Sequence, residues 1–163
     1  MIRHVLAGAA AGAAGTTALN AVTYLDMAVR GRGASDVPEE AADRLAASVR
    51  LPVRGSGEHR DNRLSGIGAL LGIATGVGVG ALLGLAGTVP GVRPDRPAGA
   101  LATALAAMVG ANLPLAVTGI SDPRTWRIAD WAADAVPHLV YGAVTAGVYG
   151  LCRPRPRRHR CCR

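Results

Sequence analysis

The stretch from Leu64 to Val89 constrains the fold of this chain more than any other feature. It holds 26 residues without a charged side chain, whereas an α-helix needs about 20 apolar residues to cross a bilayer. In water, glycines would destabilise such a helix by roughly 0.8–1.0 kcal/mol each relative to alanine, but in lipid they let a neighbouring backbone approach closely. The pattern predicts a membrane helix with a glycine-zipper face. Five glycines recur at every fourth position on that face: Gly68, Gly72, Gly76, Gly80 and Gly84.

The apolar composition of the rest of the chain also favours a membrane protein. Half of the 163 residues are apolar, yet aromatic residues make up only 3% and Phe is absent. A water-soluble core takes much of its buried area from large aromatic side chains. Here Ala, Gly, Leu and Val dominate, which favours close helix packing in lipid.

Positive charge is concentrated at the end of the sequence. The formal net charge is +7, every basic residue is Arg, and six of them lie between Arg153 and Arg163. Because this tail follows an apolar run directly, it predicts a cytoplasmic anchor that attracts anionic lipid headgroups, and no nucleic-acid binding. His159, Cys161 and Cys162 lie too close together for tetrahedral zinc, so we expect no metal and no cofactor.

Four apolar segments predict an all-α fold, a transmembrane four-helix bundle that forms a single domain over residues 1–152. The spans are expected at 5–29, 64–89, 97–120 and 132–152, followed by a disordered basic tail at 153–163. The first segment also has the basic start and small-residue run of a secretory signal, but its apolar character continues past any cleavage point, which favours an uncleaved span. An even number of spans places both termini on one side. The arginine tail predicts that this side is the cytoplasm of a bacterium, with the protein in its plasma membrane.

The polar connector at 30–63 contains one short amphipathic helix. Asp36 is expected to cap it, with Pro38 in the first turn and Glu39 completing a pair that resembles a capping box. The apolar face of this helix is expected to carry Val37, Ala41, Leu45 and Val49. The helix would lie on the membrane surface or over the bundle.

Polar residues inside the first, third and fourth spans form the candidate site. On alternating helices their positions fall at the same membrane level, near the face opposite the termini, with Asp26 at the rim. The functional interpretation is a polar pocket, in which His138 titrates near neutrality and Asp134 is its partner one turn away. The alternative is plain interhelical hydrogen bonding, at roughly 0.6 kcal/mol per contact, with Asp26 and Asp134 simply in the headgroup region. The residues are Asn20, Tyr24, Asn112, Asp134, His138 and Tyr141.

Two further groups of residues have expected structural roles. Trp126 and Trp131 are the only tryptophans and precede the fourth span, where an interfacial aromatic belt would place them. In the first span, Gly8 and Gly12 are expected to pack against another helix. Since no nucleophile lies in a hydrolase motif and no strand precedes the glycines as in a dinucleotide-binding loop, we expect no enzyme.

The segments AGAAGTTALNAVTYLDMAVRGR at 11–32 and DPRTWRIADWAADAVPHLVYG at 122–142 resemble small, uncharacterised multi-pass membrane proteins of high-GC bacteria. The resemblance implies several spans and no particular activity. Two functional hypotheses follow from the residues. In the first, the protein acts through helix–helix association, as a homo-oligomer or with an unknown membrane partner, and the glycine face is either the oligomer contact or an internal packing seam. In the second, an oligomer forms a small transporter or channel with the polar cluster as its pathway.

Overall fold

The computed structural model describes residues 1–154, which fold into five α-helices and one short 3-10 turn (η1, Pro123–Thr125). Four helices are long and apolar enough to cross a membrane: α1 (Ile2–Arg30), α3 (Glu58–Ala86), α4 (Pro97–Val117) and α5 (Ile128–Cys152). A short helix, α2 (Val37–Ser48), lies in the first connection. The predicted all-α fold, with four spans and a short helix in the first loop, is confirmed. The chain is a multi-pass membrane protein.

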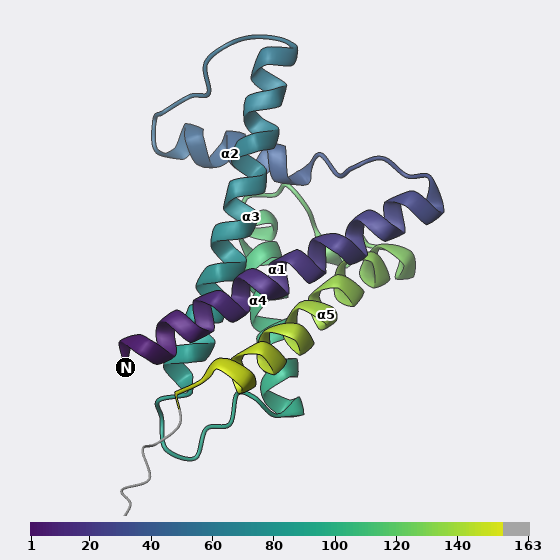
Figure 1. The fold of residues 1–163 in the computed structure, drawn as a ribbon. Helices are drawn as coiled ribbons and strands as arrows, with labels where there is room; N and C mark the ends of the chain where they lie inside the picture. Colours follow the sequence, from purple (N-terminus) through teal and green to yellow (C-terminus); the bar gives the residue numbers. More distant parts are fainter. Residues whose placement is uncertain (155–163) are drawn as a thin grey trace, which may run out of the picture.

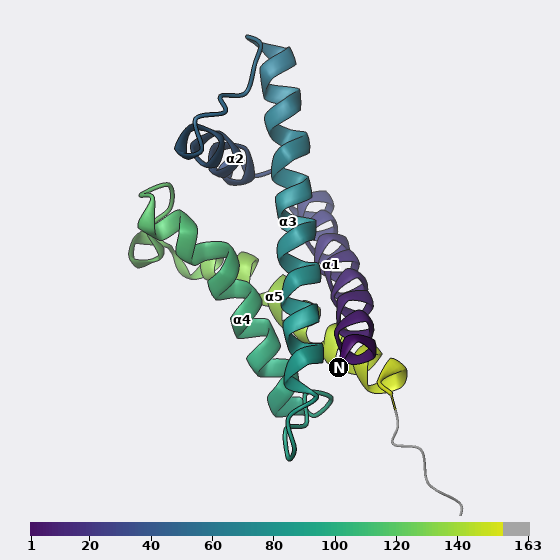
Figure 2. The ribbon, with the colours of Figure 1, turned by 90° about the vertical axis from the view of Figure 1, so that its left-hand side faces the viewer.

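The four long helices alternate in direction and contact one another in the cyclic order α1, α3, α4, α5. Antiparallel α1 and α5 lie side by side and cross α3 obliquely (Figure 1). α4 leans away from α3 toward α2 (Figure 2). The contact between α3 and α4 is therefore less extensive than the contacts between the other neighbouring long helices. The start of α1, the α3–α4 loop (residues 87–96) and Arg153 lie at one end of the bundle, here called the terminal end. The opposite end, called the α2 end, carries α2 and the α4–α5 loop (residues 118–127).

Two helices, α1 and α3, meet through glycines on both sides. Gly8 and Gly12 of α1 face the last three glycines of the row on α3. A Cβ atom built on Gly12 would lie 2.6 Å from the carbonyl oxygen of Gly76, and one built on Gly80 would lie 2.5 Å from the Cα of Gly12. No side chain fits at these distances. We call this contact the glycine seam; its members are Gly8, Gly12, Gly76, Gly80 and Gly84.

The first two glycines of the row lie outside the seam. A Cβ atom on Gly68 would lie 2.8 Å from the carbonyl oxygen of Pro38. At Gly68, α3 therefore makes its close contact with α2 and not with α1. Gly72 has nothing within 4 Å of its Cβ position. One periodic row of glycines on α3 therefore has three different environments, because α3 is crossed by two different helices at different heights.

Small side chains and two tyrosines fill the bundle interior. Tyr149 is fully buried and packs with Ala11 of α1 and Leu83 of α3. On the other side of α5, Gly142 contacts Ala104 of α4, and a Cβ atom there would lie 2.7 Å from the Cβ of that alanine. Small residues therefore bring α5 close to α4, whereas Tyr149 fills the space between α5, α1 and α3.

Several helix boundaries differ from the predicted spans, and three of the differences have a clear local reason. α3 begins at Glu58, and its charged first turns extend beyond the apolar segment. α4 ends at Val117, because Gly119 adopts a left-handed conformation (φ 71°) that stops the helix. α5 begins at Ile128, where the Asp130 carboxylate accepts a hydrogen bond of 2.9 Å from the backbone N–H of Arg127.

The predicted apolar face of α2 (Val37, Ala41, Leu45 and Val49) is not the face that packs on α3. The side of α2 that packs on α3 carries Ala42, which is 1% exposed, whereas Leu45 and Val49 are 48% and 56% exposed. Asp36 occupies the N-cap position, but its side chain makes no capping hydrogen bond. Close contact between α2 and α3 at Gly68 selects the small side chains of α2, so the larger ones face outward.

Candidate functional site: a polar cluster between α4 and α5

Three of the predicted site residues meet where α4 and α5 pack at the α2 end. The side-chain amide of Asn112, near the end of α4, donates a hydrogen bond of 2.8 Å to Oδ2 of Asp134 on α5. One turn later, Nδ1 of His138 lies 2.7 Å from the backbone carbonyl oxygen of Asp134 and 3.5 Å from its Oδ1. We call these three residues the polar cluster.

The surroundings of His138 fix the roles of its ring nitrogens. Both atoms close to Nδ1 are oxygen acceptors, so we assign the proton of the neutral ring to Nδ1. This leaves Nε2 as an acceptor, and no hydrogen bond to it occurs within residues 1–154. The side chains of His138 and Asp134 are 11% and 22% exposed. The cluster thus has one unused acceptor in a largely buried position.

The depth of the polar cluster follows from helix geometry. α5 has 25 residues, and at 1.5 Å per residue it is about 37 Å long, more than the roughly 30 Å hydrocarbon core. Asp134 lies about 9 Å and His138 about 15 Å from the start of this helix. His138 is therefore close to the middle of α5, and Asp134 lies between that position and the start of the helix at the α2 end.

Both helices of the cluster contain a proline close to it. Pro137 precedes His138 in α5, and Pro114 follows Asn112 by two positions in α4. Since proline has no backbone N–H, the carbonyl groups of Ala133 and Gly110 lose their helical donors. Freed carbonyls at membrane depth are tolerated where they line a cavity or protein, and here they add acceptor groups around the cluster.

Tyr141, another predicted member, points away from the cluster. Its hydroxyl donates a hydrogen bond of 2.6 Å to the backbone carbonyl of Gly76 on α3, and the residue is 1% exposed. One turn further along α5, the hydroxyl of Thr145 is fully buried and has no hydrogen-bond partner within residues 1–154. Tyr141 thus connects α5 to α3 instead of joining Asp134 and His138.

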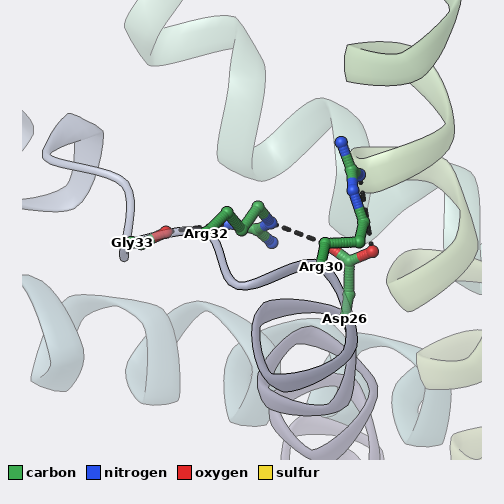
Figure 3. Close-up of polar contacts among 4 residues, drawn as sticks. All are labelled: Asp26, Arg30, Arg32 and Gly33. Carbon is green, nitrogen blue, oxygen red and sulfur yellow. Dashed lines mark hydrogen bonds and ion pairs between the residues drawn. The ribbon is translucent and has the colours of Figure 1, made fainter.

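The predicted members on α1 do not join the cluster. Asn20 is half-buried, Tyr24 is 63% exposed, and neither side chain makes a hydrogen bond within the described part of the chain. The buried positions of α1 end at Thr16, so the helix is less tightly covered beyond it. Asp26 binds Arg30 and Arg32 at the end of α1, with its Oδ2 2.6 Å from Nε of Arg32 (Figure 3). Its charge is offset locally.

The two tryptophans lie next to the cluster at the α2 end. Their rings meet edge to face with centroids 5.1 Å apart, and Nε1 of Trp126 donates a hydrogen bond of 3.0 Å to Ser121. Together with Asn112 and apolar residues of α4 they line an open cavity of about 320 Å³. This position is at the end of a span, the level at which interfacial anchors lie.

A second polar network, at the terminal end, was not anticipated from the sequence. Nδ1 of His4 lies 2.8 Å from the hydroxyl of Tyr149, and Arg153 donates a hydrogen bond of 2.9 Å to Asp95. Only the antiparallel arrangement of the first and fourth spans could have predicted it, because that arrangement brings the start of the first span beside the end of the fourth. The network joins α1, α5 and the α3–α4 loop.

Within residues 1–154, no group of three or more His, Cys, Asp or Glu side chains could hold a metal ion. His159, Cys161, Cys162 and most of the basic tail lie outside the described residues.

Comparison with known proteins adds no relative. No protein family, no curated protein and no solved structure matches the chain. The resemblance to small bacterial membrane proteins therefore stays a prediction, and functional reasoning rests on the polar cluster and the helix contacts.

Proposed function

We propose that this multi-pass protein is the subunit of a small channel or transporter that carries protons across a bacterial plasma membrane, with both termini in the cytoplasm. The observation that supports this most is the placement of Asp134. Its carboxylate accepts a hydrogen bond from Asn112 on a second helix and lies 3.5 Å from His138, and the side chains of Asp134 and His138 are only 22% and 11% exposed. Ionisable residues inside a span are costly and mark ion or proton pathways.

The partners of Asp134 favour exchange of a proton over a fixed charge. In the described residues, its only potential cationic partner is His138, and no arginine reaches it. A permanent Arg–Asp pair would keep the carboxylate ionised, as Arg30 and Arg32 do for Asp26. A carboxylate beside an imidazole, with no arginine to fix its charge, is a combination that proton pathways in membranes use.

A complete pathway requires more than one copy of the chain. The bundle interior beyond His138 is filled by Tyr141 and the glycine seam, so a single copy offers no polar route along its axis. In a homo-oligomer, the polar cluster of each copy would line a pathway together with its neighbours. Four spans per subunit suit this arrangement.

Helix–helix association as the main role is the second candidate. The glycine seam is occupied within the chain, which leaves other surfaces for a partner. Gly72 and Gly78 on α3 have nothing within 4 Å of their Cβ positions, and small uncovered residues are the type through which membrane helices approach. An accessory subunit would use this uncovered part of α3.

Proton flux into liposomes tests the proposal. The full chain is reconstituted with a pH-sensitive dye inside, and a potassium gradient with valinomycin drives protons inward. We expect faster acidification than in empty liposomes, a loss of at least tenfold in Asp134→Asn and His138→Gln, and no change in Asp130→Asn. Asp130 is the matched control, because it lies one turn away on the same helix and is exposed. Absence of flux in the wild type, or equal flux in all variants, would overturn the proposal.

A further inference from the structure

A cavity of about 520 Å³ lies at the terminal end, remote from the polar cluster. Its walls come from three parts of the chain: the first turn of α1, the α3–α4 loop and the residues after α5. Among the lining side chains are His4, Arg93 and Arg153. The cavity is partly open, and two arginines and a histidine line it.

Positive charge around this cavity exceeds negative charge. Asp95 binds one nitrogen of Arg153 at 2.9 Å, while Arg93 is exposed and has no ion pair within residues 1–154. Arg3 and Arg96 lie at the same end of the bundle. The one carboxylate shown here is paired with Arg153, and the donors of Arg93 have no ion-pair partner among residues 1–154.

The start of α1 adds to the same electrostatic effect. This helix of 29 residues has no acidic residue in its first turn and no side-chain cap. The N-terminus of a helix carries unpaired backbone N–H groups and the positive end of the helix dipole, which together favour anions. Met1 and His4 place this helix end in the cavity wall. Two arginines and a helix start therefore border the same cavity.

The level of the cavity points to the kind of anion. α3 ends at Ala86, α5 ends at Cys152 and α4 begins at Pro97, so the cavity lies where three spans leave the hydrocarbon core. Phospholipid phosphates lie just outside that core. Basic pockets between helices at this level are suited to anionic headgroups, and guanidinium groups bind phosphate with paired hydrogen bonds.

We propose that this cavity binds a phosphate group, supplied by the headgroup of an anionic phospholipid, with Arg93 as its main ligand and Arg153 and the start of α1 as supports. A free phosphate compound has the same chemistry and is the other possible source. The site is independent of proton transfer at the polar cluster, since it lies at the opposite end of the bundle.

Thermal unfolding of the purified full chain tests this proposal. The protein is kept in an uncharged maltoside detergent, and helix content is followed by circular dichroism as a function of temperature. Titrations use phosphatidylglycerol, phosphatidylcholine or inorganic phosphate. We expect phosphatidylglycerol to raise the melting temperature and phosphatidylcholine to leave it unchanged. An equal rise with inorganic phosphate would support the site and identify a soluble phosphate as the source.

Variants separate the cavity from the basic tail. Arg93→Gln should raise the half-saturating phosphatidylglycerol concentration about tenfold, since a charge-assisted hydrogen bond is lost. Val92→Glu, which adds a carboxylate to the cavity wall, should act in the same direction. The matched control Arg124→Gln, an exposed arginine at the α2 end, should leave the titration unchanged.

Two results would overturn the proposal. One is a wild-type melting temperature that responds to neither phosphatidylglycerol nor phosphate. The other is a response that survives both Arg93→Gln and Val92→Glu but disappears when Arg155, Arg157, Arg158 and Arg160 are changed to Gln, because the tail would then be the binding element.

Discussion

The hydroxyl of Tyr141 donates a hydrogen bond of 2.6 Å to the backbone carbonyl of Gly76. This bond joins α5 to α3 in the interior of the bundle, at a member of the glycine seam. Gly76 has no side chain to shield its carbonyl, so the phenol can reach a backbone group on a helix that has few other polar atoms. The bond couples two features of the fold, a tyrosine at the centre of α5 and a glycine in the row of α3.

Removing that hydroxyl should lower stability measurably. Tyr141→Phe loses one buried hydrogen bond, and we expect the free energy of unfolding to fall by about 0.5–1.5 kcal/mol. Titration with sodium dodecyl sulfate, followed by circular dichroism, gives this quantity. Tyr24→Phe is the matched control, because Tyr24 is 63% exposed and should be neutral. Equal effects of the two substitutions would contradict the bond.

The glycine seam predicts opposite outcomes for two glycines of the same helix. Gly80→Leu inserts a side chain against the backbone of Gly12, whereas Gly78→Leu enters open space. Overpacking costs about 1–3 kcal/mol in ordinary cores, and a backbone contact leaves less room to relax, so we expect Gly80→Leu to lose at least that much. Limited proteolysis in detergent reports the change. If Gly78→Leu were equally sensitive to protease, the seam would not account for the result.

The bond between Asn112 and Asp134 predicts energetic coupling between α4 and α5. In a double-mutant cycle with Asn112→Ala and Asp134→Ala, we expect a coupling free energy of about 0.6–1.7 kcal/mol. Asn112→Ala combined with Asp130→Ala provides the control, and these two effects should add to within about 0.5 kcal/mol. Additivity in both cycles would show that the 2.8 Å contact has no energetic role.

Asp122 predicts a pH-dependent loop next to the tryptophans. Hydrogen bonds from the backbone and side chain of Arg124 hold the pKa of the Asp122 carboxyl below its ordinary value. A lowered pKa means that the ionised form stabilises the turn at Pro123–Thr125 above the ordinary pKa, about 3.9, and that this contribution is lost as the pH falls through the lowered one. Carbon-13 NMR of the Asp122 carboxyl gives the titration directly. A midpoint at or above the ordinary value would contradict the hydrogen bonds.

Hydropathy was sufficient to predict the number of long helices. The four apolar segments correspond to α1, α3, α4 and α5. An uncharged run of that length has one stable form in lipid, the helix, because the backbone must satisfy its own hydrogen bonds. Spacing alone did not identify which helix each glycine meets, since Gly68 and Gly80 have the same sequence environment but contact different neighbours.

The candidate site was predictable only in part, for a geometric reason. Asn112, Asp134 and His138 lie on two helices that are adjacent in sequence and pack along each other, so depth and register were enough to bring them together. Tyr24 has a suitable depth but lies beyond the last buried position of α1. Two residues at the same distance along their helices make contact only if the helices also lie side by side at that point. The sequence does not give the direction in which each helix leans.

The cyclic order of the helices has a consequence for biosynthesis. α1 packs on α3 and on α5, and α5 is the last of these to leave the ribosome. At 5–20 residues per second, the roughly 120 residues between the end of α1 and the end of α5 take on the order of ten seconds to translate. During that time a weakly apolar first helix has no complete set of neighbours. Nascent chains arrested before residue 128 should therefore retain α1 in contact with the insertion machinery, and release should follow the emergence of α5.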